Sequence, residues 1–129
     1  MIPAVSAVLF VRDVRRVTRF YTAVFGAHVL AVDDRHAALD VRGFRLVIHE
    51  TTPRLPPCES GLPERREAAA IRIDYRIEDL VDARIAAKQH GGQLDESPPP
   101  WAPPGTNFFL GFDPEGNVFG VTPAGEAAK

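Results

Sequence analysis

The strongest constraint on the fold is that one order of predicted secondary structure occurs twice along the chain. Val11-Arg-Asp-Val14 and Ile77-Glu-Asp-Leu80 share a pattern and lie 66 residues apart (position 11 against position 77). Gly26 and Gly92 lie at the same offset. Similarity at a fixed offset indicates two structurally similar modules. A duplication alone says nothing about chemistry.

The first module is predicted to contain a strand, a helix and three further strands. Apolar and β-branched residues 4–11, "AVSAVLFV", predict a buried strand. Asp13 is suited to cap a helix whose apolar residues recur at a spacing of three and four, and Gly26 is suited to end it. The predicted elements after the first strand are the helix Val14–Phe25 and the strands His28–Val32, His36–Val41 and Phe44–Glu50, the last two joined by a tight turn at Arg42-Gly43.

A proline-rich and charged connector separates this module from the second. After it, the chain predicts a strand over Ala69–Ile77, a helix capped by Glu78 or Asp79 and running to about Gln89, and a short strand at Gln93–Asp95. Following the loop "SPPPWAPPG", "NFFLGF" and "NVFGVT" predict a hairpin around Asp113-Pro-Glu-Gly116. We therefore expect one domain over residues 1–129, with module one at about 4–50, a connector at 51–67 and module two at about 68–123.

Three of these stretches resemble motifs of the vicinal oxygen chelate superfamily, which includes glyoxalase I, extradiol dioxygenases, fosfomycin-resistance enzymes and bleomycin-binding proteins. They are "VRDVRRVTRFYTAVFGA", "IEDLVDARIAAKQHGG" and "DPEGNVFGV", and the resemblance spans about residues 4 to 123. It implies an α+β fold of two tandem β-α-β-β-β modules forming a curved mixed sheet around a cleft, usually in a homodimer. The superfamily contains several chemistries and simple binders, so the resemblance alone does not define the function.

Composition narrows the classes of partner. The net charge of −2 and the scattered basic residues do not favour binding to nucleic acid or to an anionic membrane surface. No apolar run approaches the roughly 20 residues that span a bilayer, and the N-terminus does not resemble a signal peptide. The single cysteine, Cys58, fits a reducing compartment, and with no histidine near it in sequence it is not expected to be a nucleophile. We expect a cytoplasmic protein.

Alternation along the strands predicts which side chains line the cleft, because successive side chains point to opposite faces. The strand residues with inward-packing parity are Val5, Ala7, Leu9, Val11, Phe44, Leu46, Ile48, Ile71, Ile73, Tyr75, Ile77, Phe119 and Val121. The residues predicted to face the cleft are Ser6, Val8, Phe10, Arg45, Val47, His49, Arg72, Asp74, Arg76, Val118, Gly120 and Thr122.

The resemblance implies four matched metal-ligand positions in this cleft, where metal-dependent members carry His, Gln or Glu. They correspond here to Ser6, Val47, Arg72 and Gly120. Serine is a weak ligand, arginine is cationic, and valine and glycine have no donor atom. Slipping a strand by one residue would turn it inside out. We therefore expect neither a standard metal centre nor another cofactor.

Other polar residues leave a second arrangement open. His36 and His49 are both suited to face the cleft, with Asp40 and Asp74 as acidic neighbours, and such a set could hold a displaced metal or act as base and orienter. The competing interpretation is that they are polar lining residues that pair with arginines. His28 and His90, beside the helix-ending glycines, are interpreted as surface residues.

The remaining candidates suit a ligand with an apolar part and an anionic group. Trp101 lies in a loop stiffened by five prolines, so it either binds a flat ligand at low entropic cost or merely covers one end of the sheet. Phe10 extends the predicted apolar lining, and the resemblance adds Phe108 and Leu110. Arg45 and Arg72 suit an anionic group, although pairing with Asp40 and Asp74 is the alternative.

These observations lead to one main hypothesis and two alternatives. The main hypothesis is a metal-free, homodimeric protein that binds an aromatic antibiotic or metabolite through Phe10, Arg45, His49, Arg72, Asp74, Trp101, Phe108 and Leu110. The first alternative is a metal-dependent lyase or dioxygenase with a non-standard site formed by His36, His49 and Asp74. The second is a structural or regulatory dimer without a ligand. The sequence does not say whether the modules pair within one chain or across a dimer.

Overall fold

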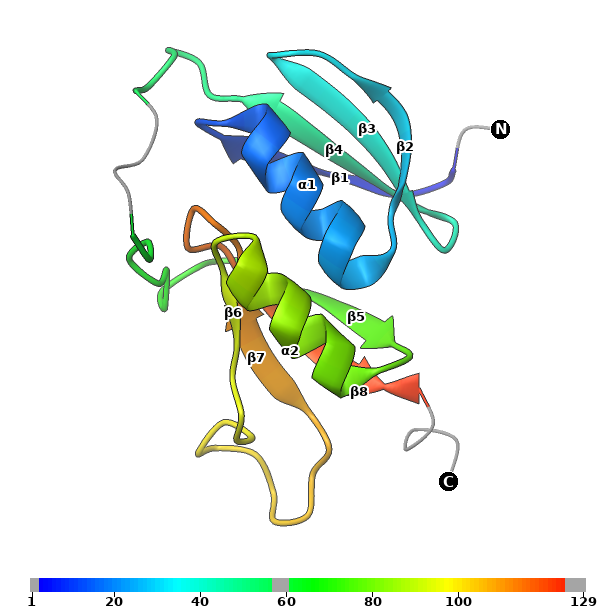
Figure 1. The fold of residues 1–129 in the computed structure, drawn as a ribbon, viewed down its shortest axis with the longest axis vertical. Helices are drawn as coiled ribbons and strands as arrows, with labels where there is room; N and C mark the ends of the chain where they lie inside the picture. Colours follow the sequence, from blue (N-terminus) through cyan, green and yellow to red (C-terminus); the bar gives the residue numbers. More distant parts are fainter. Residues whose placement is uncertain (1–2, 57–60, 125–129) are drawn as a thin grey trace.

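The computed structural model describes residues 3–56 and 61–124, and it contains the same order of elements twice (Figure 1). Cys58 lies outside the described residues. Module one contains β1 (Ser6–Val11), α1 (Val14–Phe25), β2 (His28–Val32), β3 (His36–Val41) and β4 (Phe44–Glu50). Module two contains β5 (Ile73–Ile77), α2 (Leu80–Gln89), β6 (Gln93–Leu94), β7 (Phe109–Phe112) and β8 (Val118–Pro123). None of the helices in the described part of the chain is long and apolar enough to cross a membrane.

The strands form two separate mixed sheets of four strands, in the orders β1-β4-β3-β2 and β5-β8-β7-β6. In each sheet the first strand is parallel to its neighbour and the other neighbouring strands are antiparallel. The helices lie side by side and cover the same side of the molecule, one helix over each sheet (Figure 1). The predicted α+β fold of two β-α-β-β-β modules is confirmed.

Both helices begin as the sequence predicts. Asp13 accepts a hydrogen bond from the amide of Arg16 at 3.1 Å, and Asp79 accepts one from the amide of Asp82 at 3.0 Å. These carboxylates satisfy amide groups that have no partner within the helix. Asp79, rather than Glu78, is therefore the cap of α2.

Helix α1 supplies the aromatic part of the core that joins the modules. Phe20 and Tyr21 are buried, and the Phe25 ring stacks on Tyr75 of β5 with centroids 4.1 Å apart. Phe25 also meets Phe119 of β8 edge-on at 5.1 Å. Such aromatic pairs contribute about 0.5–1.5 kcal/mol each beyond the burial of their area. The stretch "FYTAVFG" therefore holds module two against module one.

The β7–β8 turn forms a second joint between the modules. The Glu115 carboxylate is buried and accepts hydrogen bonds from the backbone amides of Arg12 at 2.7 and 2.9 Å and of Asp13 at 2.8 Å. Asp113 is fully buried and accepts a hydrogen bond from the Tyr21 hydroxyl at 2.9 Å. Burial raises the pKa of the Asp113 carboxyl, although its hydrogen bonds to Asn117, Glu115 and Tyr21 act in the opposite direction.

The predicted boundaries of module one agree with the structure except at its start, where β1 begins at Ser6. The prediction for β5 was too long, since the strand begins at Ile73. Its partner β8 begins at Val118, and Ile73 pairs with Phe119, so residues before Ile73 have almost no neighbouring strand. Ile71, which we expected to pack inward, is 81% exposed for this reason. The same prediction was wrong for Val5, which precedes β1 and is 68% exposed.

Candidate functional site

Five of the eight predicted ligand residues lie on strands, at the sheet surfaces that the helices do not cover, and the other three, Arg72, Trp101 and Phe108, lie in the segments before β5 and β7. On β1, Ser6, Val8 and Phe10 are exposed while Val11 is buried, as the alternation predicts. On β5, Tyr75 and Ile77 are buried while Asp74 and Arg76 are exposed. We name these surfaces face one, on the β1-β4-β3-β2 sheet, and face two, on the β5-β8-β7-β6 sheet.

Face two carries a compact group of aromatic and charged side chains. The Trp101 and Phe108 rings lie 6.1 Å apart, and the Arg72 guanidinium lies 5.1 Å from the Phe108 centroid and 5.8 Å from that of Trp101. Arg72 donates to the Asp74 carboxylate from Nε at 2.7 Å and from Nη2 at 3.1 Å. This hydrogen bond raises the pKa of Arg72 above its ordinary value. Four of the eight predicted ligand residues are thus brought together.

Gly120 forms the floor of this group. A Cβ atom at this position would overlap Oδ1 of Asp74 and would lie 2.5 Å from Cζ of Phe108. Real Cβ atoms do not approach other atoms so closely, so the space where the resemblance implies an acidic ligand is filled by the side chains of Asp74 and Phe108. Leu110 pairs with Gly120 across the β7–β8 ladder and completes the predicted set on this face.

Face one carries an arginine without a carboxylate partner among the described residues. Arg45 is half-buried, and its Nε is a buried atom with no hydrogen-bond partner there. Asp40 is opposite Arg45 in the β3–β4 register, but its Oδ2 accepts a long hydrogen bond from the Gly43 amide at 3.4 Å instead. The two arginines therefore differ. The charge of Arg72 is neutralised by Asp74, whereas the charge of Arg45 is available to a ligand.

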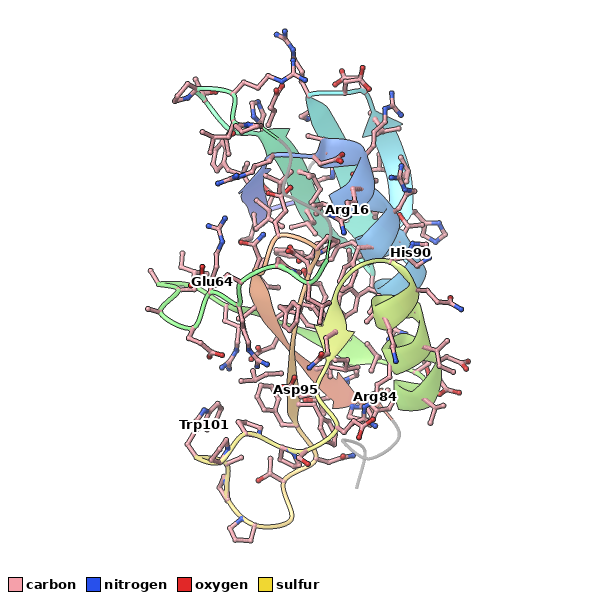
Figure 2. All side chains as sticks on the ribbon, turned by 60° about the vertical axis from the view of Figure 1, so that its left-hand side comes forward. Arg16, Glu64, Arg84, His90, Asp95 and Trp101 are labelled. Atoms are coloured by element: carbon pink, nitrogen blue, oxygen red, sulfur yellow. The ribbon has the colours of Figure 1, made fainter. Side chains whose placement is uncertain are left out.

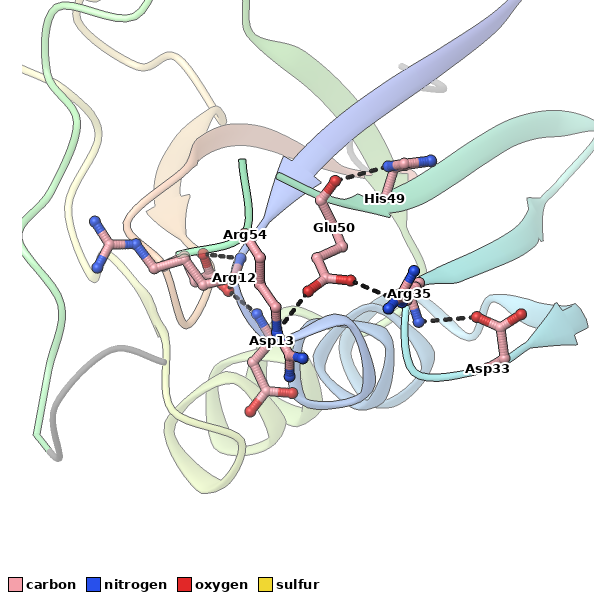
Figure 3. A network of polar contacts seen from close by, with 8 residues as sticks. Arg12, Asp13, Asp33, Arg35, His49, Glu50 and Arg54 are labelled. Atoms are coloured by element: carbon pink, nitrogen blue, oxygen red, sulfur yellow. Dashed lines mark hydrogen bonds and ion pairs between the residues drawn. The ribbon is translucent and has the colours of Figure 1, made fainter. Parts of the chain in front are cut away.

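An aromatic group surrounds His49 on the same face. The His49 ring lies 5.6 Å from Phe10 and 6.2 Å from His36. Its Nδ1 lies 2.7 Å from the carbonyl oxygen of Glu50 (Figure 3). A carbonyl only accepts hydrogen bonds, so Nδ1 carries the proton, and Nε2 is the nitrogen available to a ligand.

The neighbouring acid, Glu50, is already occupied. Its side chain is 10% exposed and forms ion pairs with Arg54 at 2.8 Å and Arg35 at 3.7 Å (Figure 3). Two guanidinium groups therefore neutralise the carboxylate that is closest in sequence to His49. This leaves His36 and His49 without a free acidic neighbour from β4.

The residues present do not fit a metal ion at the four positions that the family implies. Val47 and Gly120 have no donor atom, Arg72 is paired with Asp74, and Ser6 offers one weak ligand. Within residues 3–56 and 61–124, no group of three or more His, Cys, Asp or Glu side chains is close enough to hold a metal ion. In one chain, His36 and His49 lie on face one and Asp74 on face two, so the alternative set is not assembled.

Three cavities lie elsewhere in the described part of the chain. Their volumes are about 1040, 480 and 400 Å³, and none of the eight predicted ligand residues lines them. The first, between α1 and α2, is lined by several cationic side chains that the sequence reasoning missed. They come from two helices far apart in sequence and follow no local pattern, so only the helix spacing brings them together. The sequence reasoning also missed Glu115, because its hydrogen bonds to the amides of Arg12 and Asp13 join segments far apart in the chain.

Comparison with known structures reveals the same fold at low identity. A fosfomycin resistance protein, FosX, from Listeria monocytogenes has a TM-score of 0.67 and 17% identity, over 96% of this chain and 93% of that protein. FosX from Mesorhizobium loti has a TM-score of 0.64 and 20% identity over the full length of both chains. A glyoxalase/bleomycin resistance protein from Albidiferax ferrireducens has a TM-score of 0.62 and 15% identity, over 90% and 93% of the two chains.

The sequence comparisons give one clear result. No curated protein sequence matches the chain. The model of one family matches residues 4–121, which is nearly the whole chain. Together with two β-α-β-β-β modules joined by "FYTAVFG" and "DPEGN", this match shows that the chain belongs to the Glyoxalase/Bleomycin resistance protein/Dioxygenase superfamily.

Proposed function

We propose that this protein binds a small aromatic or apolar ligand that carries an anionic group, and that it does so without a metal ion. The main support is the filled space at Gly120, where Phe108 and Asp74 occupy the position of the expected acidic ligand. The Asp74 carboxylate there is already held by two hydrogen bonds from Arg72, and the Phe108 ring suits apolar contact rather than metal coordination.

The ligand contacts follow from the two faces. Trp101, 64% exposed, and Phe108 supply an aromatic surface on face two, with Phe10, 55% exposed, on face one. Arg45, which has no carboxylate partner among the described residues, offers its charge to an anionic group, and His49 offers Nε2. Leu110 adds apolar surface, while the Arg72–Asp74 pair offers a polar edge.

We also propose that two copies of the chain form the site. Val8, 49% exposed, and Phe10 lie uncovered on face one, and Trp101 lies uncovered on face two. In the described residues, β1 and β5 are edge strands, and no ladder joins the two sheets. Free edges beside apolar faces favour pairing with a second copy, so that module one of one chain would face module two of its partner.

Metal content and ligand binding test the proposal. Protein purified without a histidine tag should contain no stoichiometric Mn, Fe, Ni or Zn, and light scattering should give the mass of a dimer. Because Trp101 is the only tryptophan, its fluorescence should respond to at least one member of a panel of aromatic antibiotics. Absence of any response together with a monomeric mass would reject the binding site.

Activity on fosfomycin tests the alternative hypothesis that the protein is a metal-dependent enzyme. The FosX proteins are fosfomycin resistance proteins, and one structure of the Listeria protein is a complex with Mn(II) and sulfate. We expect this chain to leave fosfomycin unchanged in the presence of Mn²⁺, as followed by phosphorus NMR. Consumption of fosfomycin that depends on added Mn²⁺, and that is lost in His36→Gln or His49→Gln, would favour the displaced metal site instead.

A further inference from the structure

The largest of the three cavities is a cationic groove on the helix-covered side of the molecule. It has a volume of about 1040 Å³ and lies where the N-terminal half of α1 meets the C-terminal half of α2. Its lining includes four permanent cations, Arg16, Arg19, Arg84 and Lys88, and one carboxylate, Glu96, which gives a net charge of +3. The whole chain has a net charge of −2. Positive charge is therefore concentrated here in an otherwise slightly acidic protein. We name this cavity the basic groove.

Most cations of the basic groove have no anionic partner in the described part of the chain. Within residues 3–56 and 61–124, the side chains of Arg16, Arg19 and Lys88 form no hydrogen bond or ion pair. By contrast, Arg42 on another surface pairs with Glu78 at 2.7 Å, and Arg15, which lies beside the basic groove, pairs with Asp34 at 2.6 Å. Unpaired like charges in one groove repel each other, which an anion would relieve.

The cations are not needed to bind the free carbonyl groups at the C-terminal end of α2. Cations near a helix C-terminus are favourable by about 0.3–1 kcal/mol. However, the carbonyl groups of Ala86, Ala87 and Lys88 already accept hydrogen bonds from the amides of His90, Gly91 and Gly92. Arg16 nevertheless lies against Gly91, where a Cβ atom would be 2.7 Å from its Nη2. Gly91 also has a φ of +89°, so a side chain there is disfavoured on both counts.

The basic groove continues into an apolar groove between α1 and β2. This second cavity of about 400 Å³ shares Arg19 and His90 with the first, and Figure 2 shows Arg16 and His90 near each other on this side, away from Trp101. Its remaining lining residues are Arg15, Thr18, Thr22, Ala23, Val29 and Val32. From Arg15 to Ala23 the groove follows α1 for about 12 Å, at 1.5 Å per residue. Val29 and Val32 are 45% and 41% exposed, so they have apolar surface available.

The other end of the helix pair shows that this charge is local. The cavity of about 480 Å³ there is lined by Asp40, Glu78, Asp79 and Asp82 against Arg42 and Arg76, a net charge of −2 with His28 neutral. The same two helices thus present a basic end and an acidic end. An anion would be attracted to the first and repelled by the second.

We propose that the basic groove and the adjoining apolar groove bind an amphipathic anion, with a phosphate or carboxylate head and an acyl tail. The head lies among Arg16, Arg19 and Lys88, and the tail passes Arg19 and lies between α1 and β2 over Val29 and Val32. This site is separate from faces one and two, so its occupation does not require the proposed ligand of those faces.

Decyl phosphate, used below its micelle concentration, is the probe for this site. We expect saturable binding that shifts the amide NMR signals of Gly91 and Gly92 and leaves Trp101 fluorescence unchanged. Decanol and inorganic phosphate, which each supply one half of the ligand, should bind at least tenfold more weakly. Equal affinity for inorganic phosphate, or shifts confined to faces one and two, would overturn the proposal.

Two double variants test separately the contacts with the phosphate head and with the acyl tail of decyl phosphate. Arg16→Gln/Arg19→Gln should weaken decyl phosphate binding at least tenfold. The charge-matched control Arg42→Gln/Arg66→Gln should change it less than twofold, because both residues are exposed and neither lines the two grooves. Val29→Thr/Val32→Thr should weaken decyl phosphate several-fold and leave inorganic phosphate unaffected. Circular dichroism and melting curves establish that each variant is folded, and the exposed single change Arg19→Gln replaces the double change if that one unfolds.

Two results in these assays would count against the site. One is equal loss of binding in the Arg16→Gln/Arg19→Gln variant and its charge-matched control, which would mean that net charge alone matters. The other is binding to phosphatidylglycerol vesicles without binding to monomeric decyl phosphate, which would make the groove a membrane-contacting surface instead.

Discussion

The two modules contain equivalent hairpins, but one turn is exposed to solvent and the other is buried between the modules. In the β3–β4 hairpin, Arg42 and Gly43 form an exposed turn with φ values of 52° and 90°. In the β7–β8 hairpin, Asp113 to Gly116 are all buried. Asp113 accepts the Tyr21 hydroxyl, and Glu115 binds the backbone before α1. Duplication therefore gave two similar hairpins, of which only one became the joint between modules.

The same contrast explains why the recognisable motifs say little about function. "FYTAVFG" and "DPEGN" meet at Tyr21 and Asp113 in the interior, where they hold the modules together. The residues that we propose for ligand binding lie on or beside the uncovered faces and follow no shared motif. The motifs that identify the family therefore lie in the buried contact between the modules, whereas the chemistry of a member depends on the uncovered faces.

The largest expected effect comes from breaking the buried turn. Asp113→Ala removes the acceptor for Tyr21, for the Asn117 side chain and for the amide of Glu115. Leaving these donors unpaired in the interior should lower the free energy of unfolding by about 3 kcal/mol or more. Asp40→Ala in the equivalent hairpin should cost less than about 1 kcal/mol, because its hydrogen bond is long and exposed. Urea denaturation measures both, and equal losses would contradict the assigned roles.

A smaller loss of stability, together with a change in Trp101 emission, should distinguish a substitution on face two from one on face one. Gly120→Ala places a methyl group where Asp74 and Phe108 already lie, so overpacking should cost about 1–3 kcal/mol. The shift of Phe108 should also alter the emission of the neighbouring Trp101. Val47→Ala, at the matching position of face one, should leave that emission unchanged. Thermal unfolding and fluorescence spectra test this pair, and an unaltered spectrum for Gly120→Ala would show that the group on face two is looser than described.

Alkaline pH should lower the stability of the fold through the buried tyrosines between the modules. Burial, with Asp113 next to it, raises the pKa of Tyr21 well above its ordinary value, and burial also raises the pKa of Tyr75. A raised pKa means that the contribution to stability is complete below about pH 10, where unfolded tyrosine ionises, and is lost as the pH rises further.

Tyr21→Phe tests this assignment. It should lower the free energy of unfolding by about 1.5 kcal/mol at neutral pH, because a hydrogen bond to a buried carboxylate is lost. Above pH 10 its stability should fall less steeply than that of the parent protein. Urea unfolding between pH 8 and 11.5 measures the slopes, and identical slopes would place the titration elsewhere.

The smallest effect concerns the two arginines of the faces. For an anionic aromatic ligand found in the fluorescence panel, Arg45→Gln should reduce affinity about fivefold, near 1 kcal/mol. Arg72→Gln should reduce it less than twofold, because Asp74 already neutralises Arg72. Titration calorimetry provides both constants. The reverse order would mean that the ligand displaces Asp74 from Arg72.

Local rules predicted much of the fold from the sequence. The bounds of α1, β2, β3 and β4 agree with the prediction, because caps, turn residues and periodicity act within a few residues. The error at β5 arose where the alternation continues beyond the end of the ladder: Ile71 has the right parity but is 81% exposed. Strand length depends on the partner strand, which is distant in sequence.

The candidate site was predictable only in part. Parity placed Phe10, Arg45, His49 and Asp74 on the uncovered faces, and the family resemblance put Gly120, which has no donor atom, at the position of an expected acidic ligand. It did not reveal that Asp74 pairs with Arg72 while Asp40 leaves Arg45 unpaired. Both pairs were available in the sequence, and side-chain geometry decided between them.

The sequence by itself determined the order of elements, the duplication and the absence of ligand atoms at Val47 and Gly120, because each depends on residue identity or near neighbours. Only the tertiary structure decided which residues fill the space at Gly120, which turn joins the modules, and which cations gather between α1 and α2. These contacts join residues far apart in the chain, such as Arg12 with Glu115 and Arg16 with Gly91. Their distances are set by the packing of helices and sheets, and no local pattern encodes them.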